Sequence, residues 1–447
     1  MNPKIIAKGI LNLLCKRYMG PFWIRRRWLN RTQWLDKEKL EQLQLNLLKR
    51  TVRHCYRTVA YYKKIMDEYG IGMDTIKTLS DIKSFPILTK KEVLEAGDSI
   101  ISSNYHKRIL RTARTGGSTG TPLIVYRNWI SIGNEHAFVQ RQWDWAGIGV
   151  SDRCAYLMSR VVAKHGRQNH RLYAYDPFMK DLILSTHHLS IKTVKHFADA
   201  IRKYRVKAIV GYPSAISFLA KSCLNLGIEL NLKAALTTSE ILTPTMCQNI
   251  TKAFRCKVFD FYGSAERVCY IHNCQYGNYH LIPEYGYTEL IPLNGSDKKF
   301  YKVVSTGFWN SAMPLIRYDT GDIVTKTKRT CPCGRQFEVI DSIDGRQGDI
   351  IKTPSGRQLG VTLIIQILYV ICGTKHILES QIVQDGLDHL TIKYVPDRKF
   401  ETKDLNDFRN LLSKSLPDEL KFDFRSVSTI EKTGNGKVRP LVSLINA

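Results

Sequence analysis

A stretch rich in glycine and hydroxyl side chains, residues 114–122, has the composition of an anion-binding loop. Three glycines and four hydroxyl residues fall within eight positions of it, which is unlike a core segment. Glycine lets the backbone turn through positive φ, and successive amides can then bind phosphate with hydroxyl groups as further donors. A polar surface turn is the alternative, and the spacing matches neither a P-loop nor a dinucleotide fingerprint. The candidate phosphate-binding residues are Thr115, Gly116, Gly117, Ser118, Thr119, Gly120 and Thr121.

Four further short stretches carry acidic, aromatic or lysine side chains in predicted turns or at predicted strand ends. They are 260–266 (Asp-Phe-Tyr-Gly-Ser-Ala-Glu), 317–322 (Arg-Tyr-Asp-Thr-Gly-Asp), 345–349 (Gly-Arg-Gln-Gly-Asp) and 433–439 (Thr-Gly-Asn-Gly-Lys-Val-Arg). Each alone is an ordinary turn sequence, in which Asp322 or Lys437 would simply be a solvated turn residue. All five stretches in this order and spacing are hard to produce by accident, and they indicate one shared site.

Three cysteines and a histidine form a candidate metal site. Cys274 and His280 lie upstream of the tight pair Cys331 and Cys333. Three thiolates and one imidazole match a closed tetrahedral zinc site, whose four protein ligands leave no open position, so the expected role is structural. The pair is closer than usual zinc spacing, which leaves open the alternative of scattered reduced cysteines. Cys269 and His272 are alternative ligands.

The elements that must position these residues follow from hydrophobic periodicity and length. A chain of 447 residues is too long for one ordinary core, so two domains are expected. Residues 36–110 read as helices, with Leu40, Leu43, Leu47 and Leu48 on one face and Asp81 or Thr89 as N-caps. Residues 130–260 alternate helices with short apolar strands, which predicts an α/β arrangement with a parallel sheet. Strands dominate 280–345, the stretch 345–349 reads as a linker, and a small α+β domain follows it.

The high positive charge of the chain favours an anionic partner. Its 67 Lys and Arg residues exceed its 40 Asp and Glu residues, a net charge of +27. Residues 1–35 hold eight of the basic residues, three tryptophans and no acid, which favours peripheral contact with a membrane surface. A basic helix packed on its own domain is the equal alternative. No recognisable nucleic-acid-binding motif is present, so nucleic acid is the weaker partner.

The remaining composition points to a cytoplasmic protein. No apolar run is long enough to span a membrane, and Lys8 interrupts the early apolar stretch that a signal peptide would need. The odd count of 11 cysteines argues for a reducing compartment rather than a disulfide framework. We therefore expect a cytoplasmic location, with the basic start resting on the inner face of the membrane.

The five stretches, with 211–214 (Gly-Tyr-Pro-Ser) and 238–240 (Thr-Ser-Glu) in support, resemble the adenylate-forming superfamily of acyl-CoA synthetases. The chain is most similar to the branch of phenylacetate–CoA ligase and CapK-type capsular polysaccharide proteins. The resemblance implies a large N-terminal α/β domain over 1–345, whose first 80 residues are a helical, basic start, a hinge at 346–349 and a small α+β lid over 350–447. It also strengthens the zinc prediction, because members of that branch carry the same Cys…His…Cys-x-Cys arrangement.

The resemblance implies a reaction in which ATP activates a carboxylic acid as an acyl-adenylate and pyrophosphate is released. Residues 115–121 would then hold the β- and γ-phosphates, and Glu266 would bind Mg²⁺ with Thr119 as a hydroxyl helper. Tyr262, next to Gly263, would lie against adenine, while Ser239 and Glu240 would line the adenine pocket.

The remaining implied roles belong to the ribose and to the reacting carboxylate. Asp322 would accept hydrogen bonds from the ribose hydroxyls, and Arg346 would touch the ribose or phosphate from the hinge. Lys437 would neutralise charge at the carboxylate and the α-phosphate. Many relatives carry Gly-Arg-x-Asp-Asp at the hinge, whereas Gly348 replaces the first aspartate here, which puts the usual domain rotation in doubt.

The acceptor of the acyl group stays open at this point. It would be CoA, or an amine or hydroxyl on a lipid-linked saccharide used in surface-polysaccharide synthesis. The alternative class of function is a catalytically degenerate nucleotide-binding scaffold at the membrane surface, which would bind ATP without turning it over.

Overall fold

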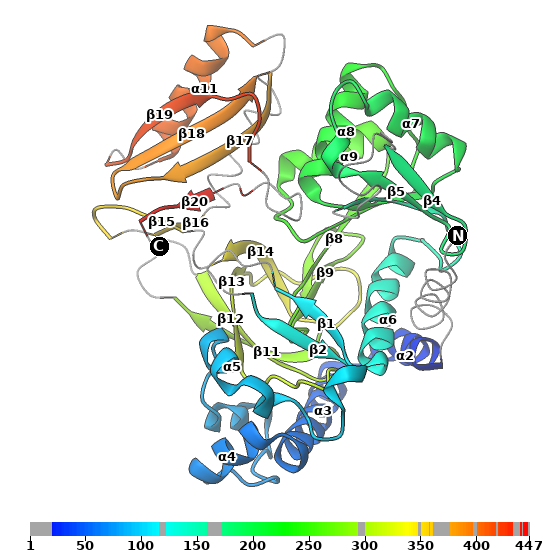
Figure 1. Ribbon diagram of the computed structural model, residues 1–447, viewed down its shortest axis with the longest axis vertical. Helices are drawn as coiled ribbons and strands as arrows, with labels where there is room; N and C mark the ends of the chain where they lie inside the picture. The colour runs from blue at the N-terminus through cyan, green and yellow to red at the C-terminus, as the bar shows by residue number, and fades with distance from the viewer. Residues whose placement is uncertain are drawn as a thin grey trace. The chain divides into compact units, whose positions relative to one another are not determined.

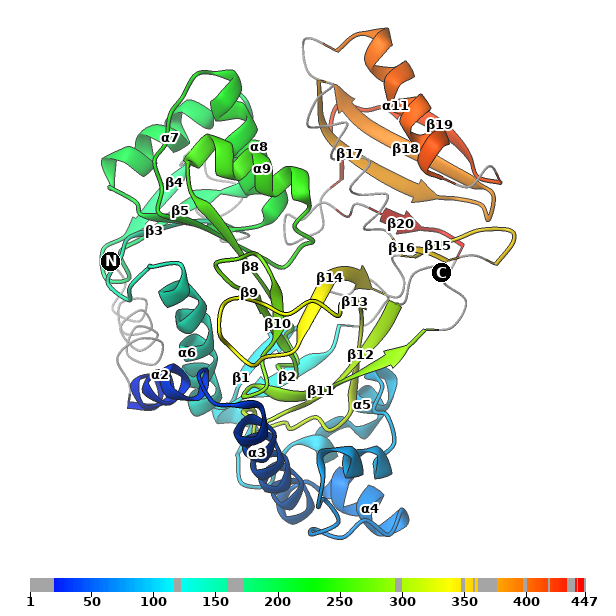
Figure 2. The same ribbon diagram turned by 180° about the vertical axis from the view of Figure 1, so that it is seen from behind.

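The computed structural model (Figures 1 and 2) describes residues 20–115, 122–158, 172–293, 300–346, 350–356, 358–360, 376–396, 400–416, 419–431, 439 and 441–445. Two compact units divide the chain between them. Unit 1 is drawn from Met1–Trp145, Phe261–Pro292 and Tyr301–Ser342, and unit 2 from Ala146–Asp260, Leu293–Phe300 and Ile343–Ala447. The predicted division at 346–349 is a different one, and it stays a prediction.

Unit 1 begins with helices, as the periodicity of its sequence predicts. They are α2 (Gly20–Thr32), α3 (Lys37–Thr58), α4 (Ala60–Glu68), the 3₁₀ helix η2 (Leu79–Ser84), α5 (Lys90–Ala96), the 3₁₀ helices η3 (Gly97–Ile100) and η4 (Lys107–Ile109), and α6 (Trp129–Trp145). Leu40, Leu47 and Leu48 are buried on one face of α3, and Leu43 is half-buried.

The helix caps follow side-chain chemistry. Asp36 caps α3 by accepting from the Lys39 amide at 2.9 Å. Thr89 caps α5 as predicted, in a capping box with Glu92. At η2, by contrast, the cap is Thr78, and Asp81 occupies the third position, where its carboxylate accepts from the Thr78 amide. Asp81 is therefore the reciprocal partner in the capping box, and not the cap.

The strands of unit 1 form the antiparallel part of a large mixed sheet. The antiparallel hairpin β1 (Arg111–Arg114) and β2 (Ile124–Arg127) stands apart from it. In this part of the large sheet, the strands are hydrogen-bonded in the order β11-β12-β13-β14-β10-β9-β8. Their bounds are β9 (Tyr270–Asn273), β10 (Tyr279–Leu281), β11 (Gly286–Pro292), β12 (Phe300–Gly307), β13 (Tyr318–Lys326) and β14 (Val339–Arg346). Strand β8 (Lys257–Gly263) begins in unit 2, as does β12 at Phe300, and β14 ends in unit 2.

Unit 2 contains the parallel strands of the same sheet. The order is β8-β7-β6-β3-β5-β4, with β3, β5, β6 and β7 parallel and β4 antiparallel at the edge. Strands β6 and β7 are buried throughout, which is typical of a parallel sheet covered by helices. The bounds are β3 (Cys154–Met158), β4 (Tyr173–Asp176), β5 (Asp181–Ser185), η5 (Thr186–His188), α7 (Val194–Lys203), β6 (Ala208–Gly211), α8 (Pro213–Asn225), β7 (Ala234–Thr238) and α9 (Pro244–Phe254).

Residues from 350 onward form a small sheet of their own. The order β19-β18-β17-β20 comes with helix α11, and the buried core includes Ile377, Leu390, Ile392 and Leu412. The bounds are β15 (Ile350–Lys352), β16 (Gln358–Gly360), β17 (Ile377–Gln384), β18 (His389–Pro396), α11 (Thr402–Ser415), β19 (Lys421–Ser426) and β20 (Leu441–Ser443). The predicted fold class, a large mixed α/β part with a small C-terminal α+β part, is confirmed.

A fully buried ion pair fastens the core of unit 1. Arg141 on α6 donates to Glu284 through Nη1 at 2.7 Å and Nη2 at 3.4 Å, and neither side chain is exposed. Thr32 at the end of α2 donates a further hydrogen bond to Glu284 at 2.9 Å. The pair therefore joins α2, α6 and the segment between β10 and β11.

Replacing Arg141 by methionine tests this pair. The Arg141→Met variant should lose about 3–5 kcal/mol of unfolding free energy, because it leaves a buried carboxylate without its cation. Denaturant unfolding measures the loss. The matched control is Arg53→Met, which breaks an exposed pair with Asp74 and should cost at most about 1 kcal/mol. Equal losses in the two variants would contradict this account.

Candidate functional site

The end of β8 carries the aromatic and glycine residues of the stretch 260–266. Tyr262 and Gly263 pair with Ile271 and Tyr270 of β9. A side chain at 263 would meet the Tyr270 ring at 2.6 Å, so only glycine fits this close approach. The chain then turns at once, with the Arg267 amide donating to the Ser264 carbonyl at 3.3 Å. Glu266 lies in this turn and is buried.

Two carboxylates of unit 1 are each held by a tyrosine hydroxyl. Tyr262 donates to Asp322 Oδ2 at 2.6 Å, across 60 residues of sequence. Tyr318 on β13 donates to Glu266 Oε1 at 3.2 Å. Burial, together with the neighbouring Asp322 carboxylate, raises the pKa of Tyr262 well above its ordinary value, so this hydroxyl stays protonated as a donor. The structure thus joins two of the five stretches directly.

Thr115 closes the base of the glycine-rich loop. Its amide donates to the Leu123 carbonyl at 3.0 Å, and the Leu123 amide donates back to Thr115 Oγ1 at 3.0 Å. These bonds extend the β1–β2 hairpin and fix both ends of the loop. The other candidates, Gly116, Gly117, Ser118, Thr119, Gly120 and Thr121, lie outside the described residues, as do Lys437, the hinge residues 347–349 and residues 1–19.

Three predicted residues belong to unit 2. Ser239 follows β7 with a positive φ of 70°, an uncommon conformation for a residue with a side chain. Glu240 accepts from the Ser214 amide at 3.2 Å, which brings the stretches 211–214 and 238–240 together. Arg346 is the last residue of β14 and is half-buried. The roles of these residues stay predictions.

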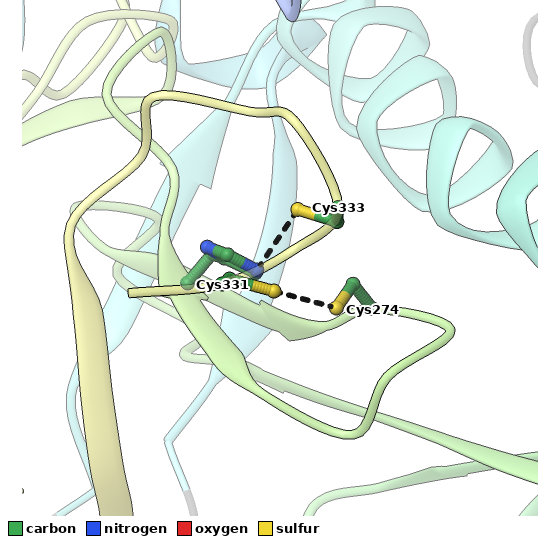
Figure 3. A group of neighbouring side chains, drawn as sticks. Cys274, Cys331 and Cys333 are labelled. Carbon is green, nitrogen blue, oxygen red and sulfur yellow. Dashed lines mark hydrogen bonds between the residues drawn. The ribbon is translucent and has the colours of Figure 1, made fainter. Parts of the chain in front are cut away.

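The four predicted metal ligands converge in unit 1, and Figure 3 labels the three cysteines among them. One ligand atom from each of Cys274, His280, Cys331 and Cys333 lies within 4.8 Å of all the others. Cys274 and Cys331 approach to 3.5 Å between sulfurs, and Cys333 Sγ lies 3.6 Å from His280 Nε2. These separations suit atoms that each bind one ion at about 2.0–2.3 Å in a tetrahedron. The donor set and its geometry therefore fit a metal site.

The surroundings of the cluster suit thiolate ligands and a neutral imidazole. The Tyr276 amide donates to Cys274 Sγ at 3.4 Å, and Asn278 Nδ2 donates to Cys331 Sγ at 3.2 Å. Burial lowers the pKa of His280 to about 4, so the ring is neutral at pH 7 as ligation requires. The alternatives Cys269 and His272 are both buried, and neither belongs to the cluster found among the described residues.

Three arginines that sequence reasoning did not single out surround these sites. Arg127 donates to the carbonyl of Ala265, inside the stretch 260–266. Arg267 and Glu135 form an ion pair at 3.6 Å directly after that stretch. Arg335, two residues after Cys333, stacks on Trp145 at 3.9 Å and donates to Gln33 at 3.1 Å. The only sequence signal that could have identified these arginines is a position next to a predicted motif, and only Arg267 and Arg335 have such a position.

Comparison with known proteins shows which proteins this chain resembles in sequence. The family model of the CapK C-terminal domain matches residues 352–443. Protein CapK of Staphylococcus aureus is 25% identical over 85% of this chain and 84% of its own length. Phenylacetate-coenzyme A ligase of Thermus thermophilus is 25% identical over 71% of this chain and 72% of its own.

Solved structures show the same fold. A 2-hydroxyisobutyryl-CoA ligase, solved in the postadenylation state in complex with R3-HIB-AMP, superposes with a TM-score of 0.72 at 16% identity, covering 92% of this chain and 90% of that one. An anthranilate CoA ligase in complex with anthranoyl-AMP gives 0.51 at 11% identity, over 75% and 67% of the two chains. In sequence the chain is similar to CapK and to the AMP-forming phenylacetate-coenzyme A ligases, and its fold is that of the adenylate-forming CoA ligases.

The Cys/His cluster predicts one metal ion per chain. Purified protein should contain one equivalent, and the double variant Cys331→Ser, Cys333→Ser should lose it because two of four ligands are gone. Elemental analysis measures the content. The matched control is Cys223→Ser, a buried cysteine of α8 in unit 2, which should retain the ion. An unchanged metal content in the double variant would show that these residues are not the ligands.

Proposed function

We propose that this protein activates a carboxylic acid with ATP, forming an acyl-adenylate and pyrophosphate, and then transfers the acyl group to an acceptor. The observation that carries the proposal is the hydrogen bond of 2.6 Å between Tyr262 and Asp322. It joins two of the five stretches in an arrangement suited to an adenosine. Similarity to the AMP-forming CoA ligases supports the same reaction class.

Asp322 and Tyr262 act on the nucleoside in this proposal. The Asp322 carboxylate accepts hydrogen bonds from the ribose hydroxyls, and charge-assisted bonds of this kind are stronger than neutral ones. The Tyr262 hydroxyl holds that carboxylate in place while its ring lies against adenine. Ser239 and Glu240 line the adenine pocket, and Arg346 contacts the ribose or a phosphate.

Positioning and charge neutralisation then account for the chemistry. A carboxylate is a poor electrophile, so transfer to the α-phosphorus depends mainly on electrostatic stabilisation of phosphate charge. Residues 115–121 hold the β- and γ-phosphates, and Lys437 neutralises the reacting carboxylate and α-phosphate. Glu266 holds Mg²⁺, with Thr119 assisting, and the ion neutralises phosphate charge when bound. The buried carboxylate of Glu266, with one donor from Tyr318, suits a hard cation.

We assign zinc to the Cys/His cluster. Three thiolates and one imidazole are its preferred ligands, and four protein ligands leave no position for substrate. The ion would fasten the segment after β9 to the segment between β13 and β14, both in unit 1. Its role is therefore structural.

The acceptor is a thiol, amine or hydroxyl. The similarity to CoA ligases supports CoA, and a lipid-linked saccharide precursor is the alternative that the resemblance to CapK-type capsular polysaccharide proteins implies. The small domain after 349, predicted to start behind the hinge 346–349, would act as a lid that supplies Lys437 and then moves to admit the acceptor.

Pyrophosphate exchange tests the proposal. Wild-type protein with a panel of carboxylic acids should exchange pyrophosphate into ATP, and Lys437→Ala should reduce the rate about 100-fold or more, as loss of one charge-stabilising group does. Asp322→Asn should raise the KM for ATP about 10-fold. The matched control Asp319→Asn, which weakens an ion pair with Lys302 and can keep the Oδ1 that accepts from the Gly321 amide, should retain the rate. ATP binding without exchange for any acid would instead favour the scaffold alternative.

One face of α2 supports peripheral membrane contact. Trp23, Ile24, Arg27 and Arg31 recur at helical spacing on this face and are exposed, Ile24 by 71%. Trp34, in the turn after the helix, is 57% exposed and lies 4.8 Å from the Arg335 guanidinium. Neither Arg27 nor Arg31 has an acidic partner among the described residues. The opposite face is buried through Phe22 and Leu29. Tryptophan and unpaired arginine on one exposed face suit an anionic lipid surface. No described helix is long and apolar enough to cross a bilayer.

Vesicle co-sedimentation tests this contact. Protein should bind vesicles with anionic lipid and release them at high salt, because the attraction is screened. The double variant Arg27→Glu, Arg31→Glu should bind at least about 30-fold more weakly, since each basic residue contributes about 1 kcal/mol. The control Arg53→Glu reverses the charge of an arginine on α3 that pairs with Asp74, and it should bind vesicles as wild type does. Equal binding by all three proteins would exclude the α2 face.

A further inference from the structure

A buried polar cluster in unit 1 surrounds the turn that carries Glu266, and nothing in the proposed reaction uses it. Helix α6 runs alongside β9 here, with Phe138 packed on Tyr285 at 4.9 Å (Figures 1 and 2). We call this group the arginine–tyrosine cluster; its members are Arg127, Glu135, Ser264, Arg267, Tyr270 and Tyr285.

One half of the cluster is internally satisfied. Glu135 accepts from the Tyr285 hydroxyl at 2.5 Å and faces Arg267 Nε at 3.6 Å. Arg267 also donates to the Ser131 carbonyl at 2.9 Å. Its φ of 58° is uncommon for a residue with a side chain, and this turn directs the guanidinium toward α6. Strain at this residue is thus offset by fixed hydrogen bonds.

The other half carries three buried donors without a partner. Arg127 Nε, Ser264 Oγ and the Tyr270 hydroxyl each lack a hydrogen-bond partner within the described chain. Tyr270 is only 1% exposed. Each unsatisfied buried group costs about 1–3 kcal/mol, so three together at one place need an explanation. Burial and the neighbouring Arg267 lower the pKa of Arg127 to about 10, which still leaves the guanidinium charged at pH 7.

The three groups are linked through the backbone of the stretch 260–266. Gly263 packs against the Tyr270 ring, Ser264 follows Gly263, and Arg127 Nη2 donates to the carbonyl of Ala265. Tyr270 in turn stacks on Tyr285 at 4.7 Å, which connects it to Glu135. Ser264 stands between Tyr262 and Glu266, the residues proposed to contact nucleotide and Mg²⁺, and the other two donors lie beside the intervening residues Gly263 and Ala265.

We infer that these donors bind the acid substrate, and that this acid carries a second acceptor oxygen, as a hydroxyl or carboxylate group, away from its reacting carboxyl. The inference rests on the proposed acyl-adenylation. A guanidinium and two hydroxyl groups match acceptor oxygens. A plain hydrocarbon acid would leave all three donors buried and unpaired. Sites built to hydrogen-bond a substrate oxygen reject the analogue that lacks it by as much as about 10⁴-fold.

The test uses wild-type protein and compares carboxylic acids of equal chain length with one another. Unsubstituted, hydroxy-substituted and dicarboxylic acids are offered in pyrophosphate exchange, and the two oxygen-bearing sets distinguish a hydroxyl from a carboxylate substrate. We expect one oxygen-bearing set to exceed the unsubstituted acids at least 100-fold in kcat/KM. The same acids should raise the melting temperature of the protein, a readout that does not need turnover.

Two conservative variants locate the effect. Tyr270→Phe and Ser264→Ala should each lower kcat/KM for the preferred acid about 10-fold and leave the unsubstituted acids unchanged, so that the preference shrinks. Their melting temperatures without ligand should equal or exceed that of wild type, because each variant removes a buried hydroxyl that has no partner among the described residues. Tyr285→Phe should lower the melting temperature, since its hydroxyl is bonded to Glu135. Tyr69→Phe, an exposed tyrosine after α4, is the matched control without effect.

The outcomes separate this inference from the reaction on which it rests. Exchange driven best by unsubstituted acids overturns the inference and leaves the acyl-adenylation standing. An unchanged preference in Tyr270→Phe and Ser264→Ala also overturns it. If no acid drives exchange or raises the melting temperature, both the proposed reaction and the inference are wrong.

Discussion

The buried ion pair between Arg141 and Glu284 is the constraint on which the packing of unit 1 depends. Removing two charges from water is costly, and the cost is offset only when both find partners of good geometry. Glu284 needs Arg141 and Thr32, and its backbone carbonyl accepts from the Trp309 indole at 2.8 Å. Segments more than 100 residues apart in sequence must therefore converge before any of them is stable.

The Cys/His cluster extends the same network. The Arg141 guanidinium lies 5.5 Å from the Phe337 ring, and Phe337 packs on His280. Arg335 stands beside Cys333 and stacks on Trp145, the last residue of α6. Three thiolates around a divalent ion would carry a net charge of −1, which Arg335 offsets. Loss of the metal would then weaken the packing of α2 and α6 as well as the loops that hold the ligands.

The sequence by itself determined the resemblance to adenylate-forming ligases, the fold class and the elements whose signals are local. The leucine spacing in α3, the Thr89 cap and the apolar runs of β6 and β8 are all patterns that lie within one short segment of sequence. Motif chemistry also selected Tyr262, Glu266, Asp322 and the four candidate metal ligands, which the structure gathers within unit 1. Thiol and imidazole groups are few enough that their spacing is informative. The roles of residues 116–121 and of Lys437 stay predictions.

Only the tertiary structure decided which groups meet. Tyr262 bonds to Asp322 and Tyr318 to Glu266 because β8, β9 and β13 belong to one sheet, a fact that no local pattern encodes. Arginines are numerous in this basic chain, so Arg127 was identified only by its contact with the turn after Gly263, and the pairing of Arg267 with Glu135 only by the fold. A polar side chain needs a hydrogen-bonding or ionic partner when it is buried, and both its burial and its distant partners exist only once the chain has folded.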